Sequence, residues 1–170
     1  QVNDRHDQYG GDFENRIKFP IQVLKAVKNA IDIPVIARLS GDEMIDDGIK
    51  LKEMIKFSKI LEKQGIEAIH VSAGTVCSTP PWYFQHMFVP KGKTWNMAGE
   101  IKKSVNVPVI AVGKINDSED IEKIRYEGMA DYMAIGRALL ADPDFVGKYL
   151  QKVDGTFRPC LACSEGCLGD

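Results

Sequence analysis

Short and almost uniformly apolar segments alternate with amphipathic segments along this chain, and that alternation constrains the fold more than any other feature. The apolar runs PVIARLS (34–40), AIHVSAG (68–74), VPVIAV (107–112) and DYMAI (131–135) predict four strands. Strands that are apolar along their whole length occur mainly in parallel sheets with both faces covered. The chain is therefore expected to be an α/β protein built from βαβ units.

Helical periodicity fills the segments around these strands. Residues 13–30 place Ile17, Ile21 and Leu24 on one face, with Asp12 as a candidate N-cap. The connection 74–94 is too long for a plain βα loop and is expected to be functional. Four β/α units fit either an open doubly wound sheet or half of an eight-stranded barrel. Further helices are expected at 48–64, 95–105, 117–127, 137–141 and 143–152.

Composition excludes several classes of protein. Lys and Arg number 22 against 24 Asp and Glu, for a net charge of −2. A nucleic-acid binder or a polybasic membrane-surface protein normally shows a basic excess. No apolar run approaches the roughly 20 residues of a membrane span, and QVNDRHDQYGG is not a signal-peptide pattern. The expectation is a cytoplasmic protein that acts on a small-molecule substrate and binds neither nucleic acid nor membrane.

Three of the four cysteines lie close together near the end of the chain. Cys160, Cys163 and Cys167 have the C-x2-C-x3-C spacing of a metal or cluster loop. Thiolates bind iron–sulfur clusters or zinc, and both normally take four protein ligands. The alternative is three unrelated thiols in a tail, while Cys77 is expected to be a small buried or loop residue.

The predicted strand ends carry the residues most suited to ligand binding. Two successive strands end in a glycine followed by a cation, Gly113–Lys114 and Gly136–Arg137. Glycine lets main-chain N–H groups approach an anion, so this pattern is typical of a phosphate site at the carboxyl edge of a parallel sheet. The alternative is that both glycines only make tight turns. Arg38, which ends another strand, is expected either to pair with an acidic neighbour or to face a bound anion.

The sequence allows two roles for each of three further residues. His70 lies inside a strand and is expected to be a core histidine with its hydrogen bonds satisfied rather than a catalytic one. Tyr83 and His86 lie in the long connection 74–94, where they either pack a lid or act as general acid and substrate contacts.

A specific family resemblance begins at DQYGGDFENRIKF (7–19). This run resembles the DxYGG-x-x-x-NR-x-RF signature of the old yellow enzyme superfamily of flavin-dependent NAD(P)H oxidoreductases. PVIARLS, IHVSAG, PVIAVGKI, DYMAIGRALLADPDF and RPCLACSEGC follow in the family's order. The last motif is similar to the cluster-containing branch, which includes 2,4-dienoyl-CoA reductase and 2-enoate reductase.

The resemblance implies which part of such an enzyme this is. Residues 1–153 would form the C-terminal half, four β/α units, of an FMN-binding (β/α)8 TIM barrel. Residues 154–170 would begin a truncated segment that binds a 4Fe-4S iron–sulfur cluster. The partners implied are the other half of the barrel and a downstream domain for FAD and NAD(P)H, with a homo-oligomer as a further candidate. The isolated chain is then expected to bind FMN weakly and to be inactive.

The family also implies roles for individual residues. Arg38 would face the edge of the flavin where negative charge collects on reduction. Lys114 stands where the family often has Arg, which keeps the charge and loses the bidentate geometry. The residues that would hold the FMN phosphate are Gly113, Lys114, Gly136 and Arg137, and three of the four cluster ligands would be Cys160, Cys163 and Cys167.

The implied reaction is reduction of an activated C=C bond in an enoate-like substrate, with hydride passing from NAD(P)H through FMN. The cluster would relay electrons between FMN and a second flavin. Cys77 and Ser78 stand where dienoyl-CoA reductases carry a Trp-His pair, so the proton donor is unassigned, with Tyr83 and His86 as substitute candidates. The alternatives are an amine-dehydrogenase-type member of the family, a non-catalytic fragment that binds phosphate-bearing ligands, and a zinc module at the cysteine loop.

Overall fold

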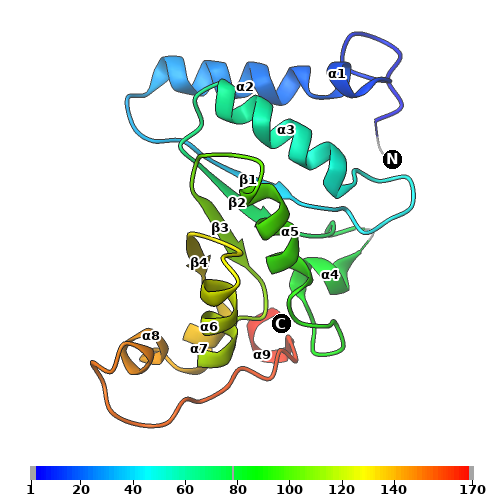
Figure 1. The fold of residues 1–170 in the computed structure, drawn as a ribbon. Coiled ribbons are helices and arrows are strands. Elements are labelled where there is room, and N and C mark those ends of the chain that lie inside the picture. Colours follow the sequence, from blue (N-terminus) through cyan, green and yellow to red (C-terminus); the bar gives the residue numbers. More distant parts are fainter. Residues whose placement is uncertain (1–2, 78, 169–170) are drawn as a thin grey trace.

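Four parallel strands form one sheet in the order in which they occur in the sequence (Figure 1). The structure, a computed structural model, describes residues 3–77 and 79–168. The strands are β1 (Ile36–Ser40), β2 (Ala68–Ser72), β3 (Val109–Val112) and β4 (Tyr132–Ala134). The predicted α/β class and all four predicted strands are confirmed, although each strand is shorter than its apolar run.

The strand order decides between the two architectures that the sequence leaves open. A doubly wound sheet reverses its strand order at a switch point, whereas the wall of a barrel adds each strand next to the previous one. Here the order is β1-β2-β3-β4, with Arg38 opposite His70 and His70 opposite Ile110 in the register. The sheet therefore has the order of a segment of barrel wall.

The helices lie between and after the strands as the periodicity predicts, with three differences. The single helix expected at 13–30 is divided at Ile17, and residues 80–84 form a short helix within the expected loop 74–94. Two prolines occupy the first turn of that helix, where a missing N–H costs nothing. The third difference is an unexpected last helix. The elements are α1 (Phe13–Arg16), α2 (Lys18–Ala30), α3 (Leu51–Lys63), α4 (Pro80–Phe84), α5 (Lys93–Lys102), α6 (Ser118–Tyr126), α7 (Arg137–Ala141), α8 (Phe145–Tyr149) and α9 (Glu165–Leu168).

The hydrophobic core lies on one face of the sheet. Ile69, Val71 and Val109 are fully buried on that face, and α5, which carries the buried Trp95, packs against β2 and β3. Figure 1 shows α2 and α3 at the β1 end of the sheet and α6 and α7 at the β4 end. Residues on the opposite face, including Ile110, are only half-buried. The expectation that both faces are covered is thus met on one face only within the described residues.

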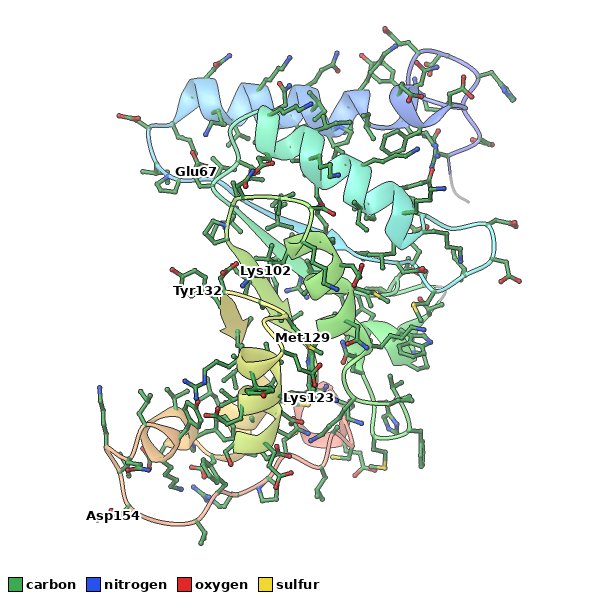
Figure 2. The ribbon with its side chains drawn as sticks, in the orientation of Figure 1. Glu67, Lys102, Lys123, Met129, Tyr132 and Asp154 are labelled. Carbon is green, nitrogen blue, oxygen red and sulfur yellow. The ribbon has the colours of Figure 1, made fainter. Side chains whose placement is uncertain are left out.

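Carboxylates tie the amino-terminal ends of two strands to helices. Glu67, beside the connection between α2 and β1 in Figure 2, accepts hydrogen bonds from Lys28 Nζ and from the Val35 main-chain N–H. The Lys28 ammonium holds the pKa of Glu67 below its ordinary value. Asp131, next to β4, lies 2.8 Å from Nζ of Lys102 on α5. These contacts fix the amino-terminal edge of the sheet to the helices that pack on it.

A second buried carboxylate fixes the start of the cysteine-bearing segment. Asp142, fully buried after α7, receives both contacts of Lys148 Nζ at 2.8 and 2.9 Å and the Arg158 main-chain N–H at 2.9 Å. The Lys148 ammonium lowers the pKa of Asp142, so the pair stays ionised near neutral pH. Lys148 also donates to the Thr156 carbonyl at 3.2 Å. The chain after α8 is thereby held against the body of the fold.

None of the helices described in residues 3–77 and 79–168 combines the length and the apolar character needed to cross a bilayer.

Candidate functional site

A cavity of about 260 Å³ opens at the carboxyl ends of the strands. Its walls come from β1 and β2, from α4 and the residue after it, and from the turns that follow β3 and β4. The structure brings together most of the site residues predicted from the sequence, since the lining includes Arg38, Tyr83, Gly113, Lys114, Gly136 and Arg137.

Gly113, at the end of β3, lies close to the side chain of Gln85, the residue after α4. Its φ of +113° is a backbone conformation that side chains rarely adopt, and an added Cβ would lie 2.1 Å from Nε2 of Gln85. Its carbonyl accepts a hydrogen bond of 2.7 Å from Nε1 of the buried Trp95. Gly113 is therefore required both by its backbone and by the side chain lying over it.

Gln85 is the main site residue that the sequence does not reveal. It follows α4, is only 5% exposed, and has a left-handed backbone with φ 49°. Its Nε2 donates to Thr94 Oγ1 at 2.5 Å, and its carbonyl accepts from Arg137 Nη2 at 3.0 Å. Nothing in the local sequence marks it, because its role depends on a tertiary approach to Gly113.

Lys114 reaches the same segment from the other side. Its backbone is also left-handed, with φ 48°. Its Nζ donates to the carbonyl oxygens of Val89 at 2.7 Å, Met87 at 3.1 Å and His86 at 3.4 Å. The side chain thus spans from the end of β3 to the wall formed by residues 86–89.

Three cations gather at this rim of the cavity. Burial lowers the pKa of Lys114, and the nearby charges of Lys91 and Arg137 lower it further. Lys91 has acidic partners, Asp117 at 2.8 Å and Asp120 at 2.7 Å. In the part of the chain that the structure describes, neither Lys114 nor Arg137 has a carboxylate within 4.0 Å. An anion at the rim would relieve this repulsion.

The start of α6 anchors both Lys91 and the turn after β3. Asp117 caps the helix in a reciprocal capping box with Asp120, as its position in the sequence predicts. Asp120 is buried and also accepts from the Asn116 main-chain N–H at 2.8 Å. Asn116 Nδ2 in turn donates to the Cys160 carbonyl at 2.9 Å. The cap therefore positions the cavity wall and the cysteine segment together.

Arg38 and His70 are neighbours across β1 and β2 and point to the same, half-covered face of the sheet. Arg38 is exposed toward the cavity, and no carboxylate among the described residues lies within ion-pair distance of it. The first of its two predicted roles, an ion pair with an acidic neighbour, is therefore not seen among the described residues. His70 differs from expectation, because its buried Nε2 has no hydrogen-bond partner in the described structure. Burial and the charge of Arg38 lower the His70 pKa, so the imidazole is neutral at pH 7.

The two candidate proton donors are separated by the structure. Tyr83 lines the cavity and packs edge-to-face on Phe84, with 5.0 Å between ring centroids. The His86 ring packs on Phe88 at 5.3 Å and is not among the side chains lining the cavity. Cys77 is exposed in the loop, and Ser78 lies outside the described residues.

The cysteine segment returns to the cavity without forming a ligand set. Ser164 Oγ accepts a hydrogen bond of 3.1 Å from Arg137 Nη1. Cys160, Cys163 and Cys167 carry free thiols, and no group of three or more His, Cys, Asp or Glu side chains in the described ranges is placed to hold a metal. The cluster ligands therefore stay a prediction.

The chain is thus an α/β protein with the strand order of a barrel wall and a cavity with a cationic rim at the carboxyl edge of its sheet. Its sequence matches the NADH:flavin oxidoreductase / NADH oxidase family over residues 1–154. The chain belongs to this family, which is the old yellow enzyme family that the motifs resemble. Its four strands and their helices correspond to part of the family's TIM-barrel domain.

Individual relatives support this membership. The chain is 40% identical to an NADH oxidase of Thermoanaerobacter brockii over 99% of its own length and 26% of that protein. It is 35% identical to a cinnamate reductase of Clostridium sporogenes over 98% of its length and 27% of that protein. A solved 2-naphthoyl-CoA reductase matches 98% of the chain and 26% of its own with a TM-score of 0.87 at 27% identity. The chain thus spans about a quarter of these proteins.

Replacing Gly113 with Ala tests the approach at the cavity wall. The new Cβ would meet the Gln85 amide in a strained backbone, so we expect the free energy of unfolding to fall by about 1–3 kcal/mol. Gly136→Ala is the matched control, because nothing lies within 4 Å of its added Cβ and its φ is −110°. Urea unfolding followed by circular dichroism measures both variants. Equal free energies of unfolding of the two variants would contradict the close approach of Gln85 to Gly113.

Proposed function

We propose that this chain supplies the FMN-binding wall of an oxidoreductase that uses NAD(P)H to reduce activated C=C bonds. The observation that carries the proposal is the single cavity that gathers Arg38 with the pairs Gly113–Lys114 and Gly136–Arg137. Membership of a flavin oxidoreductase family supports the cofactor. The names of two relatives, cinnamate reductase and 2-naphthoyl-CoA reductase, support an unsaturated acyl-type substrate.

The residues present fit FMN in chemistry and in space. The cationic rim at Lys114 and Arg137 suits a phosphate, and Gly136 leaves open space where a side chain would otherwise stand. Gly113, Lys114, Gly136 and Arg137 would surround that phosphate. FMN bound here would supply hydride transfer from the nicotinamide to the double bond.

Arg38 would bind the flavin ring rather than the phosphate. It stands on β1, two strands away from the Gly113 turn, and its guanidinium has no acidic partner among the described residues. A fixed, unpaired cation stabilises negative charge that develops beside it. Its neighbour His70, kept neutral, adds no competing positive charge.

The position of the chain in a larger enzyme is part of the proposal. Residues 1–153 would be the C-terminal half of the FMN barrel and residues 154–170 the start of a 4Fe-4S segment, of which 169–170 lie outside the described residues. The remaining barrel strands and a downstream FAD- and NAD(P)H-binding domain would be its partners, and a homo-oligomer is a further one. The free thiols suit the reducing cytoplasm, which is the location we propose.

The amine-dehydrogenase alternative has less support in this chain. The amine-oxidising structures that match it, a histamine dehydrogenase and 6-hydroxypseudooxynicotine amine oxidase, are 22% identical and share the fold alone. A substrate panel of enoates and amines with the protein that carries this chain separates the two reactions.

Replacing Arg38 with Met tests its role toward the flavin. Loss of the cation should weaken FMN binding and lower the reduction potential of the bound flavin by about 30 mV or more. Arg38→Lys, which keeps the charge, should lower the potential less. Arg125→Met on the exposed face of α6 is the control. Spectroelectrochemistry of the protein that carries this chain measures the potential. An unchanged potential in Arg38→Met would contradict the role of Arg38 toward the flavin.

Replacing Tyr83 with Phe tests the proton donor. Because Tyr83 lines the cavity and the His86 ring does not, we expect Tyr83→Phe to slow reduction of the unsaturated substrate by about a hundredfold. The reduction of the flavin by NAD(P)H should stay unchanged. His86→Gln is the matched comparison and should affect neither half-reaction. Stopped-flow measurement of each half-reaction decides, and the reverse pattern would assign the proton to His86.

The cluster proposal rests on the spacing of Cys160, Cys163 and Cys167 and on the resemblance of RPCLACSEGC to the cluster-containing branch of the family. Anaerobically prepared protein that carries this chain should contain iron and acid-labile sulfide in equal amounts, about four of each per chain. Ser replacement of Cys163 should remove both, whereas Cys77→Ser should not. Zinc without sulfide would replace the cluster by the alternative zinc module.

A further inference from the structure

Lys114 and Arg137 line the same cavity but use their donors differently. An ammonium has three N–H donors and a guanidinium has five. The three contacts of Lys114 Nζ all go to main-chain carbonyls of the covering segment, those of His86, Met87 and Val89. These contacts account for every donor that the ammonium has.

Arg137 keeps donors in reserve. One Nη2 hydrogen bond goes to the Gln85 carbonyl and one Nη1 hydrogen bond goes to Ser164 Oγ. Its three remaining N–H donors have no partner among the described residues, and the side chain lines the cavity. Arg137 can therefore bind an anion without giving up its contacts, whereas Lys114 cannot.

The segment that Lys114 holds, residues 86–89, is also tied by the buried side chain of Val89 and by a hydrogen bond of 2.9 Å from the Val89 N–H to the His86 carbonyl. Gln85 fixes its start through Arg137 and Thr94, and Lys91 fixes its end through Asp117 and Asp120. Between these ends, Met87 and Phe88 expose large parts of their side chains. Lys114 is the side chain that holds the carbonyls of this middle stretch.

The backbone of Lys114 is consistent with this task. A left-handed φ of 48° is uncommon for a residue with a Cβ and persists only where the surroundings impose it. It follows directly on Gly113, whose carbonyl is fixed by Trp95. The turn thus leaves β3 rigidly and carries the ammonium to residues 86–89.

We propose that Lys114 is a positioning residue, whose ammonium holds residues 86–89 as the wall of the cavity, while Arg137 supplies the side-chain contact to the ligand's phosphate. The identity of the ligand in these two roles rests on the proposed function. The role of Lys114 toward the wall stands without it.

Lys114→Met tests the proposal in the protein that carries this chain, with two readouts. Without flavin, hydrogen exchange in peptides covering 85–92 should become about tenfold faster, because three charge-assisted hydrogen bonds are lost. Lys114→Arg, which keeps donors at this place, should restore most of the protection. Lys103→Met, an exposed lysine of α5 paired only with Glu100, is the matched control and should leave exchange unchanged.

Binding of FMN and of riboflavin, which lacks the phosphate, gives the second readout. Lys114→Met should weaken the binding of riboflavin as well as that of FMN, by about tenfold for riboflavin, whereas Arg137→Met should weaken FMN binding alone. Unchanged riboflavin binding in Lys114→Met, or unchanged exchange at 85–92, overturns the proposal. If the wild-type protein binds neither flavin, the proposed function fails, and the exchange of 85–92 still decides the role of Lys114.

Discussion

Parallel pairing of all four strands sends every carboxyl end to one edge of the sheet, and the position of the cavity depends on this constraint. Residues far apart in the sequence, such as Arg38 and Gly136, line one cavity there because all four strands run in the same direction. The helices that link the strands must then cover a single face, where Ile69 and Val109 are fully buried. On the other face, Arg38 lines the cavity, whereas the Nε2 of its neighbour His70 is buried.

Charge is distributed unevenly along the strand axis. At the amino-terminal edge, the carboxylates of Glu67 and Asp131 meet lysines from the helices and are neutralised locally. At the carboxyl edge, Lys114 and Arg137 lack acidic partners among the described residues. Ion pairs thus occur at both edges, since Lys91 is paired with Asp117 and Asp120 at the carboxyl edge. The carboxyl edge also keeps two cations without such partners in the described part of the chain, as expected if it has to receive an anion.

Much of this arrangement follows from the sequence. Uniformly apolar runs locate the strands, and the helix expected at 117–127 locates α6, although its capping box of Asp117 and Asp120 is seen only in the structure. The glycine–cation pairs locate the cavity because a glycine at a strand end marks, in the local sequence, a place where main-chain N–H groups can approach an anion. The spacing of Cys160, Cys163 and Cys167 predicts a ligand set, yet it fixes only their separation along the chain and not their convergence in space.

What escaped the sequence depends on tertiary approach. Gln85 lies in a left-handed conformation over Gly113, and no propensity predicts a polar side chain packed there. The break at Ile17 follows from Pro20, because proline has no N–H to donate to the Arg16 carbonyl four residues earlier. The unpaired Nε2 of His70, by contrast, reflects a strand face that apolar patterning alone cannot show to be half-covered. Whether Arg38 pairs with an acid likewise depends on neighbours from other strands.

The two contacts of Arg137 connect positions 52 and 27 residues away along the chain. Contacts of such separation close large loops, and the entropy of closure is lost before the contact forms. Order at the rim of the cavity therefore has an entropic cost, which these two hydrogen bonds help to offset. A ligand that bonds to the same guanidinium would add to that offset, so ligand binding and structural order at this edge are thermodynamically linked.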